Sequence, residues 1–501
     1  MTLIIMMGVI TDDRHADADE RSKSIETLTS RQTLNALGID DSQLSFFVDG
    51  SDYRSEEEEV LVRILHVFPK IPLDALQRWA TNAPAWTQLE GAPQDYRGDI
   101  RTISGVVKEF QAIRLSPAMA DRWQMKQYYR AWVQLDHDAR HVELLVGHVP
   151  LAWTQAESAN AFSPQHVSAV GMFLKRGSAP RGSNQESAAA DKPNDAANGD
   201  AFQGAPTVVM AAQRIAWHPT QVDKILGVTA ATAELGQHRF DVGLLDDVQD
   251  RRELTHADRE PFYQLMGMER QLPDDDRLSV REKMNGVHLP SINVAQLLAS
   301  PDNYRGCRLA YRGVARRALR IVVNDNDIRS RFGIDHYYEL EVFVTLDLPI
   351  RILTSADDVE GRTLRNFPIV ACVRDLPPGM REGEVIREEV TVSGNFLKVY
   401  AYPSKFLTDR KPMDPEPMMQ SPLLVGGRVE LTELVRRDDN DWWGLLLGIA
   451  ALTAIGLVAM MVWRNSQGDR RFQRNVLDRH RGAQDVAWPQ PAQRESSLDQ
   501  E

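Results

Sequence analysis

Among the residues of this sequence, three histidines are the best candidates for metal ligands by their type and spacing. His137 and His141 lie four residues apart, and His148 follows. Histidines at that spacing converge on a metal only when they lie on a helix, and the surrounding residues predict strands and turns. We therefore expect exposed histidines here. The sequence assigns no catalytic, cofactor-binding or metal-binding residue, and it predicts no cofactor.

Tyrosines and arginines form the candidate binding surface. Two tyrosine pairs could stack against bases or other rings, although aromatic residues at the start of a strand also pack within sheets. Alternating arginines could make a basic face for an anionic partner, but the many acidic residues nearby also fit a solvated, mixed surface. The candidates are Tyr128, Tyr129, Tyr337, Tyr338, Arg308, Arg312 and Arg316.

Four consecutive glutamates also attract attention. Ser55 precedes Glu56–Glu59, and Ser55 and Glu58 have the spacing of a capping box. An acidic run is stabilised at the positive end of a helix dipole. We expect a solvated helix start rather than a metal cluster, with the helix ending near Pro69.

The elements that carry these residues occur twice. Tyr-Arg-Gly at 96–98 and 304–306 is followed by Gly-Val at 105–106 and 313–314, and then by the tyrosine pairs. A Gly-x-Phe-Leu-Lys motif is the last shared motif in each copy, at 171–175 and 394–398. Such order and spacing indicate an internal duplication. The copies share glycine, apolar and turn residues, and few residues that could perform chemistry.

Each unit combines a lead helix with several short strands, which predicts an α+β chain. Residues 56–69 and 258–273 have similar helical patterns, and the glycine-marked strands that follow favour a small barrel. Tyr-x-Gly followed by Gly-Val resembles the first strands of OB-fold modules, in which glycine lets a strand coil around the barrel. The resemblance implies a five-stranded barrel and no particular ligand.

The chain divides into seven segments on composition. The predicted order is: 1–54, an N-terminal segment with a possible weak signal; 55–217, the first repeat unit with a disordered loop at 176–204; 218–254, a connector; 255–435, the second repeat unit; 436–441, a juxtamembrane segment; 442–463, a transmembrane helix; and 464–501, a disordered tail.

The transmembrane helix follows from 22 residues without a charge, from Trp442 to Trp463. This length crosses a hydrocarbon core of about 30 Å, with Trp442, Trp443, Trp463 and Arg464 as interfacial anchors. More arginines follow the span than precede it, which places the tail in the cytoplasm and the large N-terminal part outside it. Gly444 and Gly448 would allow a weak homodimer through the helix.

Composition limits the partners. The formal net charge of −13 over 501 residues makes nucleic acid an improbable partner. Two cysteines, Cys307 and Cys372, are too few for a disulfide scaffold, and two buried thiols are the simpler expectation over one bridge.

The sequence therefore favours a membrane-anchored, non-enzymatic binding or scaffolding protein of the cell envelope with an unidentified protein or polymer partner. The alternatives are a cytoplasm-facing OB-fold pair that binds nucleic acid or oligosaccharide, and a membrane-anchored enzyme.

Overall fold

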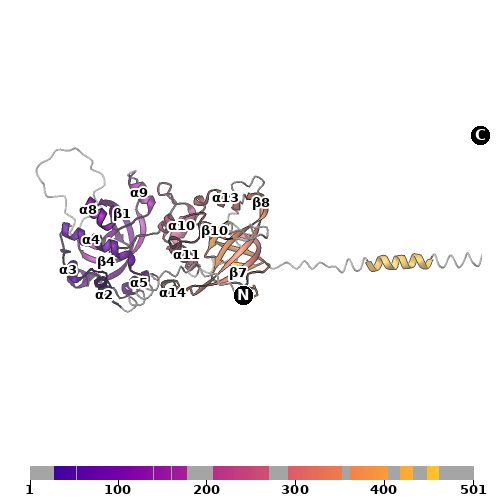
Figure 1. Ribbon diagram of the computed structural model, residues 1–501, viewed down its shortest axis with the longest axis horizontal. Coiled ribbons are helices and arrows are strands. Elements are labelled where there is room, and N and C mark those ends of the chain that lie inside the picture. Colours follow the sequence, from indigo (N-terminus) through magenta and orange to yellow (C-terminus); the bar gives the residue numbers. More distant parts are fainter. Residues whose placement is uncertain are drawn as a thin grey trace, which may run out of the picture. The chain divides into compact units, whose positions relative to one another are not determined.

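The described part of the chain is mixed α+β and contains two six-stranded β-sheets (Figure 1). The computed structural model describes residues 28–51, 54–138, 140–158, 161–177, 207–269, 292–352, 362–403, 418–432 and 448–461. The predicted N-terminal signal, most of the loop at 176–204 and the tail at 464–501 lie outside these ranges. We call residues 28–217 the first module and residues 229–432 the second module.

The first module places short helices around six strands. Its helices are α2 (Ser30–Ala36), α3 (Asp41–Leu44), α4 (Ser55–Val67), η1 (Phe68–Lys70), α5 (Leu73–Thr81), α6 (Trp86–Gly91), α7 (Pro93–Tyr96), α8 (Pro117–Trp123) and α9 (Leu151–Ser158). Its strands are β1 (Ile100–Arg114), β2 (Gln127–Leu135), β3 (His141–Val146), β4 (Gln165–Arg176), β5 (Thr207–Ala212) and β6 (Ala216–Trp217).

The second module follows a similar order. Its helices are α10 (Ala230–Gln237), η2 (Val242–Asp247), α11 (His256–Met268), α13 (Val294–Ala299), η3 (Pro301–Asn303) and α14 (Asn326–Phe332). Its strands are β7 (Arg308–Val322), β8 (His336–Ile352), β9 (Arg362–Val373), β10 (Glu388–Pro403), β11 (Met418–Val425) and β12 (Val429–Leu431). The predicted lead helices correspond to α4 and α11, and α4 ends just before Pro69.

Both sheets close on themselves through the same set of pairings. In the first, the order β1-β2-β3-β5-β4 returns to β1, and β6 adds to β4; in the second, β7-β8-β9-β11-β10 returns to β7, and β12 adds to β10. The third and fifth strands are parallel in each module. The register shifts also agree, at Val107/Glu109 and Ala315/Arg317 on the first strand. Five strands therefore form each barrel.

Glycines allow the closest strand contacts in both barrels. A Cβ on Gly105 would lie 2.1 Å from the carbonyl oxygen of Gln134, and one on Gly313 would lie 2.4 Å from that of Phe343. Each glycine pairs with two neighbouring strands at once. The Gly-Val repeat thus marks the point where the first strand bends between its partners.

Backbone conformations match as well. Three non-glycine residues among those described have positive φ, and a glycine with positive φ occupies the corresponding place in the other module. The pairs are Gln124 with Gly333, Arg239 with Gly38, and Arg251 with Gly50. The left-handed region favours glycine, so these turns are shared features of the two backbones.

The similarity between the two modules extends into residues 218–254, which the sequence predicted to be a connector. Residues 29–68 align with 230–269 without a gap, at a constant offset. Leu34 of α2 and Leu235 of α10 both pack against the glycine of the Tyr-Arg-Gly motif, at 3.2 Å and 2.8 Å from the position of its Cβ. The helices α10 and η2 therefore begin the second module.

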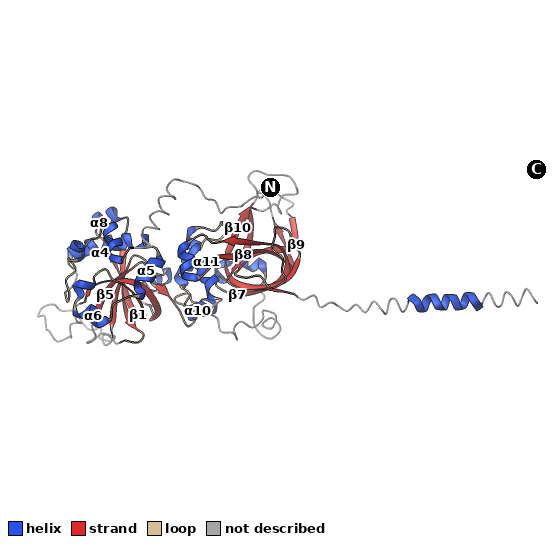
Figure 2. Cartoon of the chain, turned by 90° about the horizontal axis from the view of Figure 1, so that it is seen from below, coloured by secondary structure: helices blue, strands red, loops and turns tan. Residues whose placement is uncertain are grey.

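The lead helices cover one side of each barrel (Figure 2). Buried residues of α4, including Leu61, Ile64 and Leu65, pack with Leu145, Leu174 and other outward-facing residues of β3, β4 and β5. The barrel interiors form a second apolar cluster, which includes Val107, Val133 and Phe173 in the first module. Burial of these faces stabilises each module at roughly 25 cal/mol per Å² of apolar surface.

A separate unit begins at Glu433. Residues 448–461 of it are helical, and all of them are exposed. Among the residues that the structure describes, no helix has both the length and the apolar character needed to cross a membrane. Residues 442–447 and 462–463 of the predicted span lie outside the described ranges.

Candidate functional site

A buried ion pair joins the lysine of each Gly-x-Phe-Leu-Lys motif to the lead helix. Lys175 Nζ lies 2.7 Å from Glu57 Oε2, and Lys398 Nζ lies 2.9 Å from Asp258 Oδ2. All four side chains are at most 1% exposed. Each acid occupies the third position of its helix. This contact ties the fourth strand of the barrel to the helix that covers it.

The arginine of each Tyr-Arg-Gly motif makes a second repeated contact. Arg97 bonds to Asp49 Oδ2 at 2.6 Å and to the carbonyl oxygen of Leu174. Arg305 bonds to Asp250 Oδ2 at 2.7 Å and to the carbonyl oxygen of Leu397. The two modules therefore share a cluster of four charged residues, which the sequence did not predict.

Two expectations about the glutamate run were wrong. Ser55 is the first residue of α4, with Arg54 at the cap position and no side-chain capping bond, so Ser55 and Glu58 form no capping box. Glu57 is buried rather than solvated. The reason is that Lys175 and the backbone N–H of Val48 both reach its carboxylate.

The tyrosines of the candidate surface lie mostly inside the structure. Tyr128, Tyr129 and Tyr337 are buried, and Tyr338 is half-buried. Burial raises the pKa of Tyr128 to about 12. The Tyr337 ring packs 5.3 Å from that of Phe262 on the lead helix.

The arginines of that surface have partners close by. Arg308 bonds to Glu269 at 3.1 Å, and Arg312 lies 3.8 Å from Glu389. The Arg316 guanidinium lies 4.4 Å from the centre of the Phe343 ring. These three residues and the tyrosines do not converge on one cavity.

The histidines and cysteines are dispersed. His141 lies on β3, His137 lies in an exposed turn, and His148 is exposed in the loop after β3. Within the described ranges, no group of three histidine, cysteine or acidic residues could hold a metal ion. Cys307 and Cys372 are free thiols, and burial raises the pKa of both.

One serine–histidine pair has hydrogen-bond geometry that a nucleophile and its base also show. Ser168 Oγ lies 2.8 Å from His218 Nε2, and His218 Nδ1 lies 3.0 Å from the carbonyl oxygen of Phe240. Burial lowers the pKa of His218. Ser168 is on a regular strand, however, paired with Ser104 and Ala216 on either side. The pair therefore fits a contact that fastens β6 to the barrel.

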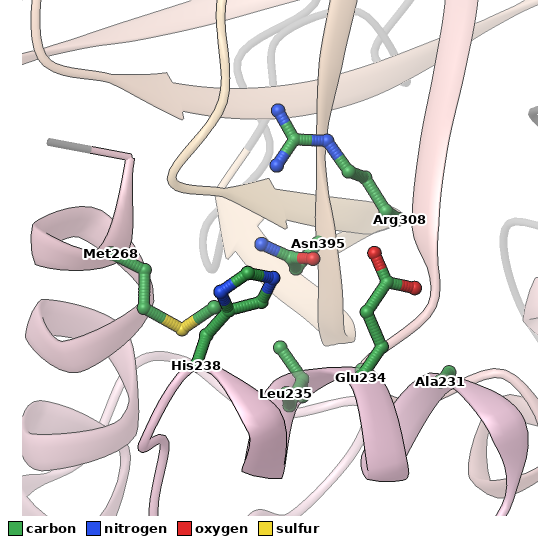
Figure 3. A pocket seen from close by; sticks show the side chains of 8 residues that line it. Ala231, Glu234, Leu235, His238, Met268, Arg308 and Asn395 are labelled. Carbon is green, nitrogen blue, oxygen red and sulfur yellow. The ribbon is translucent and has the colours of Figure 1, made fainter. Parts of the chain in front are cut away.

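A small pocket lies where α10 and α11 meet the second barrel (Figure 3). It measures about 10 Å³, the size of one water molecule. Its wall combines apolar and polar side chains, and in Figure 3 the amide of Asn395 points toward the ring of His238. The lining residues are Ala231, Glu234, Leu235, His238, Met268, Gly306, Arg308 and Asn395.

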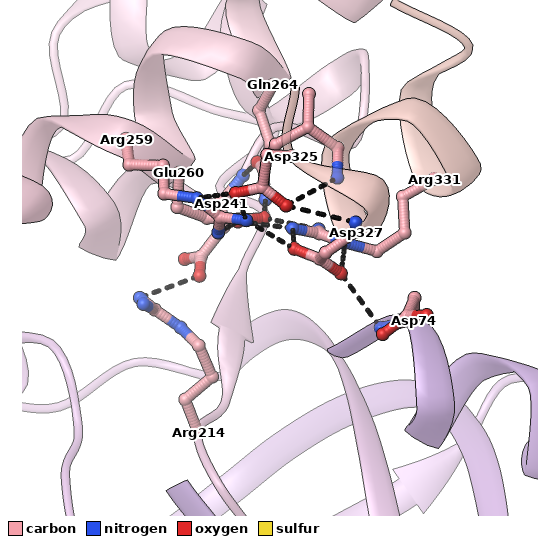
Figure 4. A network of polar contacts seen from close by, with 10 residues as sticks. Asp74, Arg214, Asp241, Arg259, Glu260, Gln264, Asp325, Asp327 and Arg331 are labelled. Carbon is pink, nitrogen blue, oxygen red and sulfur yellow. Dashed lines mark hydrogen bonds and ion pairs between the residues drawn. The ribbon is translucent and has the colours of Figure 1, made fainter. Parts of the chain in front are cut away.

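A polar network connects α11, α14 and α5 (Figure 4). The Asp327 carboxylate accepts hydrogen bonds from Arg259, Arg331 and the backbone N–H of Asp74. Burial opposes ionisation of Asp327, but the two guanidinium groups lower its pKa overall. Asp74 lies in the first turn of α5, whose cap residue Pro72 makes no side-chain bond. Asp327 thus caps a helix of the first module.

Among the described residues, the ion pairs and hydrogen bonds above join strands and helices of the fold, and the small pocket beside α10 is lined by both polar and apolar side chains. No protein-family model and no curated protein sequence matches the chain.

Proposed function

We propose that this chain is a membrane-anchored, non-enzymatic binding or scaffolding protein of the cell envelope, built from two duplicated OB-fold-like modules. One observation carries the proposal. The charged residues that both modules retain, around Lys175 and Lys398, contact each other in buried pairs. Charged groups that pair with each other inside the protein connect elements of a scaffold and are shielded from any substrate.

The duplication itself is supported by the backbones. Both barrels have the same pairings, equivalent bulges and left-handed turns at corresponding positions. A five-stranded barrel with this closure resembles an OB-fold. Two such modules on one chain can engage one extended partner or two partners, with a gain from effective concentration.

Membrane attachment is supported by residues 442–463. The stretch is uncharged, and the apolar side chains of its described part are exposed, among them Leu452 at 70% and Met461 at 70%. Exposed apolar surface of this extent marks an interaction site. The arginines that follow it favour a cytoplasmic tail, with both modules outside the cytoplasm.

Alkaline extraction of membranes tests the anchor. The full chain should remain in the membrane pellet, and a chain lacking residues 442–463 should move to the soluble fraction. Release of the full chain by alkali would refute anchoring.

Ligand titration of the detergent-solubilised full chain separates the functional classes. We expect no binding to single-stranded nucleic acid at physiological salt, because the chain is acidic. Tight, salt-sensitive nucleic-acid binding would contradict the proposal and favour the cytoplasm-facing alternative.

A further inference from the structure

We propose that the pocket of the second module binds a primary ammonium group, carried by a lysine side chain of a partner protein. The inference rests on the proposed binding function and specifies the chemistry of the partner. The two modules differ in the side chains at this place.

The first module packs apolar side chains where the second module has polar ones. Leu37, Phe68, Ile100 and Met172 correspond to His238, Glu269, Arg308 and Asn395, and Thr33 corresponds to Glu234. Phe68, Ile100 and Met172 are at most 2% exposed in the first module. The surrounding backbone is the same in both, because Leu34 and Leu235 keep the same glycine contact. The second module has therefore exchanged a packed core position for a polar hollow.

Asn395 is the residue whose placement points to a ligand. It is 3% exposed, and its side chain has no hydrogen bond to any residue that the structure describes. Figure 3 shows its amide directed into the pocket. Asn395 is not one of the fully buried, unpartnered polar groups among the described residues, so its amide keeps access to the pocket, whereas Met172 at the same place in the first module is fully buried. A bound polar group would satisfy the amide.

Size and chemistry select a primary ammonium. The pocket has room for one group about the size of a water molecule, such as an ammonium. Its acceptors are the Glu234 carboxylate, the Asn395 carbonyl oxygen and a ring nitrogen of His238. An ammonium has three N–H donors for three such acceptors. Arg308 is held by Glu269 at 3.1 Å, and Glu269 also pairs with Arg428 at 2.6 Å. One carboxylate thus serves two guanidinium groups, and the Glu234 carboxylate supplies the further negative charge that an ammonium needs at this pocket.

The shape of the pocket favours lysine over an amino sugar. Ala231, Leu235 and Met268 give it an apolar wall, which suits the methylene stem of a lysine. A pocket with room for about one water-sized group does not admit a sugar ring, so an amino group attached directly to a ring would be excluded.

A titration with Nα-acetyl-lysine methylamide, using the full chain in detergent, tests the inference. We expect saturable binding with a dissociation constant of about 1 mM, and at least tenfold weaker binding by Asn395→Met and by Glu234→Thr. Both substitutions install the residue of the first module, and unfolding curves check that the variants fold. Glu382→Thr, at an exposed glutamate, should bind as the unmodified chain does.

Three outcomes would overturn the inference: no saturable binding by the unmodified chain, unchanged binding by both pocket variants, or equal binding of glucosamine or of the uncharged norleucine analogue. Because the titration uses a free probe in detergent, these outcomes bear on the pocket and leave the membrane anchor to its own test.

Discussion

Removal of one partner from a buried ion pair should strongly destabilise the first module. In Lys175→Met the Glu57 carboxylate keeps the N–H of Val48 at 2.8 Å but loses its counter-charge in a site that is 0% exposed. An uncompensated buried charge costs about 3–5 kcal/mol. With a urea slope of about 3 kcal/mol per M, the unfolding midpoint should fall by about 1–1.7 M.

Tryptophan fluorescence during urea unfolding measures this effect. The second module, residues 229–432, contains no tryptophan, whereas the first contains Trp79, Trp86, Trp123, Trp132, Trp153 and Trp217. Trp442, Trp443, Trp463 and Trp488 lie outside both modules, so they are replaced by phenylalanine in all variants, and the remaining emission reports on the first module. Two variants control the interpretation. Arg122→Met breaks a pair with Glu59 whose side chains are 64% and 56% exposed, and it should cost at most about 1 kcal/mol. Adding Glu57→Gln to Lys175→Met removes the stranded charge and should recover at least about 2 kcal/mol.

A loss below about 1 kcal/mol in Lys175→Met would refute this reasoning. It would mean that water or a neighbouring group compensates the carboxylate when Lys175 is absent.

Three further outcomes follow from the structure. Arg251→Gly, which restores the glycine that the first module carries at Gly50, should stabilise the second module by about 0.5–1 kcal/mol in thermal unfolding; a loss would show that the two turns differ. Gly105→Ala should destabilise the first module by about 1–3 kcal/mol in the urea assay, because the new Cβ would lie 2.1 Å from a backbone oxygen. The folded state holds the pKa of His218 below 6.5, so its contribution to stability is present above about pH 6.5 and is lost as pH falls; stability measured from pH 5 to 7 should vary less with pH in His218→Gln.

The sequence predicted the parts of the fold that local patterns encode. The Tyr-Arg-Gly and Gly-Val repeats, the helices at 55–67 and 256–268, and the bend at Gly105 all reflect short-range backbone requirements. The sequence offered residues 218–254 as a connector, because the helix at 230–237 has little sequence similarity to 30–36 beyond Leu34 and Leu235. The correspondence between the two helices becomes clear in the structure, because Leu34 and Leu235 both contact the glycine of a Tyr-Arg-Gly motif.

The charged clusters could not be derived from spacing alone. Glu57 and Lys175 are 118 residues apart, and Asp258 and Lys398 are 140 apart. The usable signal was that Asp49 and Glu57 recur eight residues apart as Asp250 and Asp258. The pocket was equally hidden, since it depends on which side chains face α10 once the barrel has closed.

Reporter fusions test the central claim of a membrane-anchored envelope scaffold most directly. A reporter active only outside the cytoplasm and one active only inside it would each be fused after Arg437 and after Glu501 of the chain. We expect extracytoplasmic activity after Arg437 and cytoplasmic activity after Glu501. Cytoplasmic activity at both positions, or a soluble fusion at either, would contradict it.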